Sequence, residues 1–233
     1  MKNIIYEDEQ IIVCYKPAGI ATQTKRVMQQ DMVSEIKNYL AREQKTDEEP
    51  YLGLVHRLDQ PVSGLLVFAK TKSAASYLSY QLNNGEFQKY YYALVIGRPM
   101  TESDVIVDYL YKDGRNNTSL VVDKDFPEAK KAVLEYRTVK TLLALEDNIE
   151  VTLLEIKLLT GRHHQIRVQL SNAGMPILGD RKYGSISSKD FSRDSACRNV
   201  ALCAHKLRFK HPVTGEELTF ERDPEDEIFE EFL

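Results

Sequence analysis

The sequence predicts an α+β fold built on a mixed, mostly antiparallel β-sheet flanked by helices and loops. Segments with period-two alternation and many branched or aromatic residues outnumber the helical ones. Most of these segments are joined by tight polar loops, whereas a doubly wound α/β sheet would need a helix between successive strands. The predicted strands cover residues 11–16, 65–70, 89–97, 104–111, 132–139 and 149–159.

Three helices of modest length are predicted, over residues 32–43, 73–84 and 163–174. The second stops at Gly85 and the third ends at a glycine, the residue type that most often ends a helix. No linker, internal repeat or low-complexity segment divides the chain, so residues 1–233 are expected to form a single domain. Its acidic end, 221–233, contains apolar pairs that could dock as a short helix. The aperiodic stretch 185–199 is expected to be a surface loop.

The composition, with 42% hydrophobic and 28% charged residues among 233, is that of an ordinary globular protein. Its three cysteines are odd in number and show no paired CxxC spacing, so neither a disulfide framework nor a zinc knuckle is indicated, and the reducing cytoplasm is the expected compartment. No apolar run approaches the roughly 18 residues of a membrane span. No HExxH spacing is present either, so neither a membrane nor a metal is an expected partner.

Charge is distributed unevenly along the chain. The last 13 residues hold seven acids and one arginine, a net charge of −6, so the overall −4 leaves +2 on the other 220 residues. The segment from Arg162 to Lys210 contains ten Lys and Arg residues and three Asp residues, which gives it a net charge of +7. This segregation permits a basic, anion-binding face, although a solvated surface without a partner has the same pattern.

The stretch VHRLDQPVSGLLVFAK, residues 55–70, places Asp59 between two apolar runs. Pro61 and Gly64 interrupt the chain before the apolar run LLVFAK resumes, which puts the acid on a loop at a strand end. An aspartate beside a proline is also common in simple turns, so the spacing alone leaves a structural role open.

Two further segments carry candidate functional side chains. TGRHHQIRVQL, from Thr160, places Arg162 and Arg167 around the first turn of a predicted helix, where backbone N–H groups also favour anions. A solvated basic helix start remains the alternative. In FQKYYYALVIG, from Phe87, Tyr91 must point to the sheet face opposite Tyr90 and Tyr92. Its ring could stack on a flat base or simply belong to the core.

Taken together, these motifs resemble those of the RluA-type RNA pseudouridine synthases. The resemblance runs in order through KPAGIATQT, HRLDQPVSGLLVFAK, KYYYALVIG, TGRHHQIRVQL, GMPILGDRKYG and AHKLRFKHPVTGE. It implies the pseudouridine synthase fold with a central RNA-binding cleft, in a stand-alone form without the small N-terminal RNA-binding module. It also implies an isomerase that converts uridine to pseudouridine in tRNA or rRNA, without a cofactor, as a cytoplasmic monomer.

The resemblance also assigns roles to single residues. Asp59 would be the catalytic aspartate, Tyr91 the active-site tyrosine of K-x-Y-x-A, and Arg167 the arginine that pairs with the aspartate. Arg57 would enter the RNA stack beside the extruded base. The residues expected to contact RNA are Arg57, His56, Arg162, His164, Gln165 and Lys16.

Four positions depart from the family pattern: Gln60, Val62, His163 and Cys203. They put substrate contacts in doubt but remove no catalytic group. Two other functions fit the same residues: an RNA-binding protein of this fold without activity, and an N-glycoside hydrolase. Glycosidases normally use two carboxylates, and the three motifs that carry the predicted catalytic residues contain only Asp59. Whether the aspartate acts covalently or removes a sugar proton to give a glycal is left open by the sequence.

Overall fold

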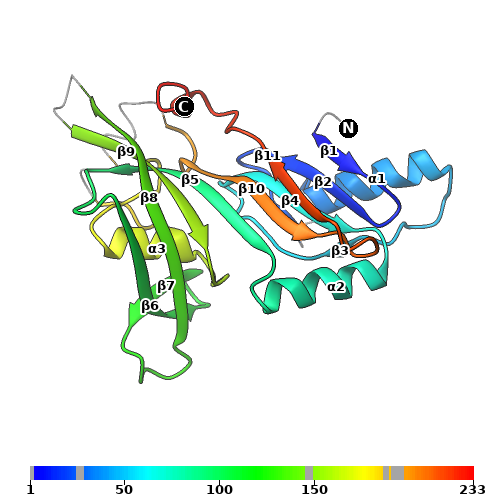
Figure 1. The fold of residues 1–233 in the computed structure, drawn as a ribbon, viewed down its shortest axis with the longest axis horizontal. Coiled ribbons are helices and arrows are strands. Elements are labelled where there is room, and N and C mark those ends of the chain that lie inside the picture. Colours follow the sequence, from blue (N-terminus) through cyan, green and yellow to red (C-terminus); the bar gives the residue numbers. More distant parts are fainter. Residues whose placement is uncertain (1–2, 25–28, 145–148, 186–188, 190–196) are drawn as a thin grey trace. The chain divides into compact units, whose positions relative to one another are not determined.

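The computed structural model describes residues 3–24, 29–144, 149–185, 189 and 197–233 (Figure 1). The chain divides into two compact units, one formed by residues 1–88 and 204–222 and the other by residues 89–203 and 223–233. The chain passes between them three times, at points within or next to strands, so no linker marks the division in the sequence. A single catalytic domain over residues 1–233 remains a prediction.

The first unit is built on strands in the order β1-β2-β4-β10, with β3 paired to β4 and β11 to β10. The pairs β1/β2, β2/β4, β3/β4 and β10/β11 are antiparallel. Every residue of β2 and β4 is buried, as expected of strands covered on both faces. The bounds are β1 Ile4–Glu7, β2 Ile11–Lys16, β3 Gly53–Leu54, β4 Ser63–Ala69, β10 Leu202–Lys210 and β11 Glu217–Glu221.

Two helices complete the first unit, α1 over Met32–Gln44 and α2 over Lys72–Asn83. The side chain of Asp31 accepts the backbone N–H of Ser34 and so caps the start of α1. Thr71 caps α2 in the same way, and α2 lies against β3 and β4. Each helix buries one apolar stripe, which in α1 consists of Met32, Ile36 and Leu40.

The second unit has the strand order β5-β9-β8-β6-β7, again antiparallel, with helix α3 (Gln165–Asn172) against β6 and β7. Val168 of α3 packs on Leu110 and Ala132. The acidic end of the chain forms a short 3-10 helix, Glu227–Phe229, and buries Phe229, so the predicted docking is confirmed. The strands are β5 Gln88–Ile96, β6 Ser103–Asp113, β7 Thr118–Val122, β8 Lys130–Ala144 and β9 Ile149–Leu158.

All six predicted strands and three predicted helices are present, and the predicted α+β class is confirmed. The strands not predicted are β1, β3, β7, β10 and β11. They are short or, in β10, alternate apolar with basic residues. Of the predicted surface loop 185–199, residues 186–188 and 190–196 lie outside the described residues.

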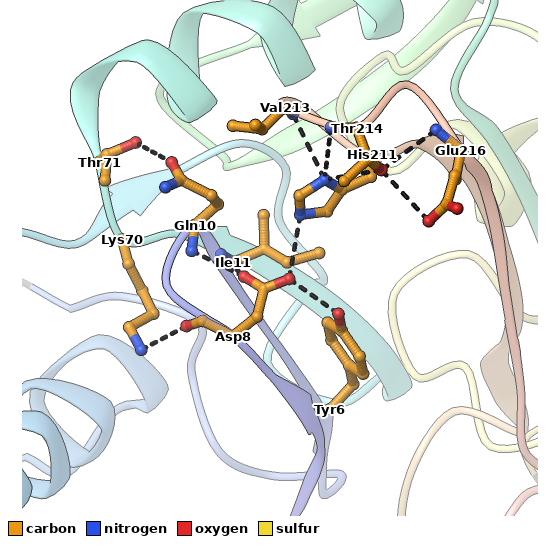
Figure 2. Close-up of polar contacts among 10 residues, drawn as sticks. All are labelled: Tyr6, Asp8, Gln10, Ile11, Lys70, Thr71, His211, Val213, Thr214 and Glu216. Atoms are coloured by element: carbon orange, nitrogen blue, oxygen red, sulfur yellow. Dashed lines mark hydrogen bonds and ion pairs between the residues drawn. The ribbon is translucent and has the colours of Figure 1, made fainter.

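A polar network in the first unit connects the turn before β2 to the hairpin between β10 and β11 (Figure 2). His211 Nε2 lies 3.0 Å from Asp8 Oδ2, which also accepts the Tyr6 hydroxyl at 2.8 Å. His211 Nδ1 accepts the backbone N–H of Thr214 at 3.1 Å, which places the ring proton on Nε2, facing the carboxylate. Oδ1 of Asp8 accepts two further backbone N–H groups, at 2.7 and 2.8 Å.

Replacing Asp8 by alanine should lower the free energy of unfolding by about 2 kcal/mol at neutral pH, because four donors lose a charged acceptor. Partial burial acts to raise the pKa of Asp8, but the backbone N–H groups, Tyr6 and His211 hold it below its usual value. A carboxylate with a lowered pKa stabilises the fold above its unfolded-state pKa. The difference between wild type and variant in urea unfolding should therefore disappear as the pH falls through the lowered pKa.

The neighbouring Glu9 provides the matched control, because it is an acid of the same turn whose side chain is exposed to solvent. Glu9→Ala should stay within about 0.5 kcal/mol of the wild type at every pH. An equal loss for both variants would show that the network around Asp8 contributes nothing.

Candidate active site

Asp59 lies in the loop between β3 and β4, at the first position of a tight turn that the Val62 N–H closes on the Asp59 carbonyl at 3.1 Å. The turn leads directly into the buried strand β4, while Asp59 itself is half-buried. The preceding residue, Leu58, is fixed on both sides by Thr22, whose hydroxyl accepts its N–H at 3.1 Å and donates to its carbonyl at 2.9 Å. The turn and the active-site interpretations of Asp59 are therefore compatible.

The loop KPAG after β2 holds this turn from the other side. Lys16 is fully buried, and its ammonium donates to the carbonyls of Pro17, Ile20 and Gln60 at 2.9, 2.7 and 3.1 Å. Gln60 makes two further bonds to Gly19: its carbonyl accepts the glycine N–H at 2.8 Å and its side-chain amide donates to the glycine carbonyl at 2.9 Å. Gln60, one of the departures from the family pattern, thus stabilises the turn that contains Asp59 through its hydrogen bonds to Gly19.

Two residues predicted to contact RNA make hydrogen bonds within the first unit. Lys16 directs its ammonium to three carbonyls of its own loops, so it is a positioning group for the Asp59 turn. His56 is buried, and its Nε2 accepts the Val67 N–H at 3.2 Å while its ring packs on Phe87. Both side chains serve buried backbone groups, and a contact of either one with RNA remains a prediction. Arg57, which directly follows His56, is exposed, as insertion into an RNA stack requires.

Strand β5 of the second unit carries Tyr91. Burial alternates along the strand, so Tyr91 points to the face opposite Tyr90 and Tyr92, as predicted. Lys89 lies two residues before Tyr91 on the same face and close to Gly161 of the segment before α3. Burial lowers the pKa of Lys89 to about 8, so its ammonium is still mostly charged at neutral pH.

Arg167 lies in the first turn of α3 and is almost fully buried. Its Nε donates to Asp180 Oδ2 at 2.7 Å and its Nη2 to Asp180 Oδ1 at 2.8 Å, a bidentate ion pair. Burial acts to raise the pKa of Asp180, but Arg167 and two backbone N–H groups hold it below its usual value. Both members of the pair are therefore charged.

The segment leading into α3 contains the other predicted RNA contacts. Arg162 is exposed, although its Nε donates to the Lys131 carbonyl at 3.0 Å. His164 adopts a left-handed conformation, φ 53°, and its ring stacks on His163 with centroids 3.7 Å apart. Gln165 is buried.

The amide of Gln165 is used within the second unit. Its carbonyl oxygen accepts the Thr160 hydroxyl and the Arg162 N–H, and its nitrogen donates to the Val133 carbonyl and the Gln169 side chain. An amide has two donor hydrogens and two acceptor sites, and all four are occupied. These bonds close the start of α3, and a contact of Gln165 with RNA remains a prediction.

His163 stands at another position that departs from the family pattern. The hydroxyl of Ser119, on β7, donates to the His163 carbonyl at 2.7 Å and lies 3.0 Å from its Nδ1. His163 therefore connects β7 to the start of α3 through hydrogen bonds with Ser119.

The predicted site residues fall into two groups. Asp59 and Arg57 belong to the first unit, and Tyr91, Arg162, His164 and Arg167 to the second. The structure brings Arg167 together with Asp180, while the pairing of Arg167 with Asp59 and the central RNA-binding cleft remain predictions. Sequence reasoning missed Lys89, Asp180 and Tyr183 as members of these groups. The signal for the last two was present in the motif GDRKYG.

Within the described ranges, no three His, Cys, Asp or Glu side chains gather to hold a metal ion. No helix of the same ranges has the length and apolar character needed to cross a bilayer.

Comparison with known proteins identifies the family. The family model described as "RNA pseudouridylate synthase" matches residues 10–172. Ribosomal large subunit pseudouridine synthase D of Vibrio cholerae is 35% identical over 98% of this chain and 69% of its own length. An uncharacterized RNA pseudouridine synthase of Aquifex aeolicus is 34% identical over 96% of this chain and 70% of its own.

The fold has the same neighbours. The structure of human RNA Pseudouridylate Synthase Domain Containing 1 superposes with a TM-score of 0.76, covering 95% of this chain and 83% of that one at 22% identity. The structure of human RNA Pseudouridylate Synthase Domain Containing 4 superposes with a TM-score of 0.75, covering 96% of this chain and 89% of that one at 23% identity. With the family model covering residues 10–172 and the Vibrio cholerae relative at 35% identity, this chain belongs to the RNA pseudouridylate synthase family and is an isomerase.

Proposed function

We propose that this enzyme converts uridine to pseudouridine in large-subunit ribosomal RNA, with Asp59 as the catalytic carboxylate. We choose large-subunit ribosomal RNA as the substrate because relatives with 35% and 32% identity are named ribosomal large subunit pseudouridine synthase D and C. The local charge of +7 between Arg162 and Lys210 supports a polyanionic substrate.

The proposed reaction breaks the N-glycosidic bond of uridine, turns the uracil over and rejoins it through carbon 5. The carboxylate of Asp59 starts it, either by adding to the substrate or by removing a sugar proton. Its position on a turn fixed by Thr22, Lys16 and Gln60 suits a group that must be held still against the ribose. An ion pair with Arg167 would keep the acid deprotonated, because an adjacent opposite charge favours the ionised form.

Two other side chains act on the base and the RNA. Tyr91 stacks on the detached uracil and keeps it in place until the new bond forms. Arg57, which is exposed beside the Asp59 turn, fills the gap left when the base leaves its stack. Arg162 is the exposed cation before α3 that can reach a phosphate.

Pseudouridine mapping of ribosomal RNA from a strain that lacks this gene tests the choice of substrate. At least one large-subunit pseudouridine should disappear, return with the wild-type gene and stay absent with Asp59→Asn. A complete large-subunit map together with a missing transfer-RNA pseudouridine would contradict this substrate and indicate tRNA.

The proposal includes a cytoplasmic monomer, as expected from the sequence. Sedimentation of the purified enzyme at micromolar concentration should give the mass of one chain, 26.8 kDa. A stable dimer would contradict this part of the proposal.

A further inference from the structure

A second layer of side chains surrounds Arg167 in the second unit. It is formed by Asp180 and Tyr183, from the segment after α3, with support from Ser119 on β7 and His164 before α3. Neither Asp180 nor Tyr183 has a role in the proposed chemistry, yet both are directed at its arginine.

Asp180 holds the edge of the guanidinium group. Its two oxygens accept from Nε and Nη2 of Arg167 at 2.7 and 2.8 Å, and its side chain is only 1% exposed. The carboxylate is itself fixed by the backbone, because Oδ1 also accepts the N–H groups of Lys182 and Tyr183 at 2.9 and 3.1 Å. The acceptor geometry is thus set by the local turn, and the arginine must conform to it.

Tyr183 holds the face of the same guanidinium group. The carbon at its centre lies 5.2 Å from the centre of the Tyr183 ring, within cation–π range. The phenol oxygen accepts the Ser119 N–H at 2.7 Å and lies 2.7 Å from His164 Nδ1, to which it can donate its hydrogen. The ring is therefore anchored at its far end by β7 and by the residue before α3.

We infer that Asp180 and Tyr183 are positioning residues that fix the guanidinium group of Arg167 in the orientation needed to meet Asp59. A guanidinium group has five N–H donors, of which Asp180 takes two. With the Nε edge and one face held, rotation of the group is blocked, and the remaining donors have a fixed direction. The inference rests on the proposed function, because it assumes that Arg167 acts on Asp59.

Asp180→Asn tests the edge contact. Asparagine keeps an acceptor for the two backbone N–H groups but loses the charge and the second acceptor. We expect kcat for pseudouridine formation to fall by about 10- to 100-fold with KM for RNA within about 3-fold of the wild type. Asp8→Asn is the matched control, because that carboxylate also accepts two backbone N–H groups but lies in the other unit. Its kcat should stay within about 2-fold.

A double-mutant cycle separates positioning from a merely structural role. In an Arg167→Lys background the bidentate geometry is already lost, so adding Asp180→Asn should lower kcat by less than about 3-fold further. The same large factor in both backgrounds, or an unchanged kcat for Asp180→Asn beside an active wild type, would overturn the inference. An inactive wild type would instead overturn the proposed function.

Tyr183 provides a second test that does not depend on Asp180→Asn folding. Tyr183→Phe keeps the ring under Arg167, whereas Tyr183→Leu removes it. We expect the phenylalanine variant to retain at least about 5-fold more kcat than the leucine variant. Equal kcat values for the two variants would overturn the role of the ring.

Discussion

Replacing Asp59 by asparagine is expected to lower kcat for pseudouridine formation by at least about 1,000-fold, with the protein still folded. A carboxamide can neither attack the sugar or base nor take up a proton, so either version of the mechanism stops. The loop keeps its shape, because it is set by bonds to the backbone of Leu58, Gln60 and Val62. Single-turnover conversion of labelled RNA measures the effect.

The exposed acid Asp47, also in the first unit, is the matched control, and Asp47→Asn should convert RNA at the wild-type rate. More than about a tenth of wild-type kcat in Asp59→Asn would contradict the assigned role, since loss of an essential base normally removes far more.

Gly64→Ala is expected to prevent stable folding, with a loss above about 4 kcal/mol. Gly64 lies at the start of β4, and a Cβ added there would come within 2.4 Å of the backbone nitrogen and oxygen of Ala204 on β10. Its φ of +122° is also one that residues with a side chain rarely adopt. The glycine thus allows two central strands of the first unit to approach beside the Asp59 turn.

Gly97→Ala separates the two causes, because Gly97 has a φ of +91° and no atom within 4 Å of an added Cβ. This variant should lose only about 1 to 2 kcal/mol, the strain of the backbone alone. Urea unfolding of the soluble fraction measures both variants. Similar stabilities for Gly64→Ala and Gly97→Ala would show that the close approach to Ala204 does not determine the fold.

The sequence was most informative about long, regular segments. Burial on both faces gives β2 and β4 continuous apolar runs, and the three helices have clear apolar stripes or glycine ends. Strand β10 was missed, because basic residues alternate with its buried Leu207 and Phe209. The division into two units was hidden, because the chain crosses between them inside strands.

For the site, the motifs identified segments better than individual roles. They located the Asp59 turn and the arginine of α3, but they did not show that Lys16, His56 and Gln165 are buried and bond within their units. A polar residue in a motif can serve substrate or buried backbone, and only tertiary contacts distinguish these roles. Lys16 bonds to the Gln60 carbonyl, 44 residues away, and His56 to the Val67 N–H, 11 residues away, and local spacing does not reveal such pairings.

Incubation of the wild-type enzyme with large-subunit RNA labelled with tritium at carbon 5 of uridine tests the central claim most directly. Isomerisation exchanges the carbon 5 hydrogen, so we expect tritium in water in a one-to-one ratio with pseudouridine formed, and no free uracil. Free uracil in place of pseudouridine would indicate glycoside hydrolysis. RNA binding with neither tritium release nor uracil from large-subunit RNA or tRNA would contradict the assignment of an isomerase.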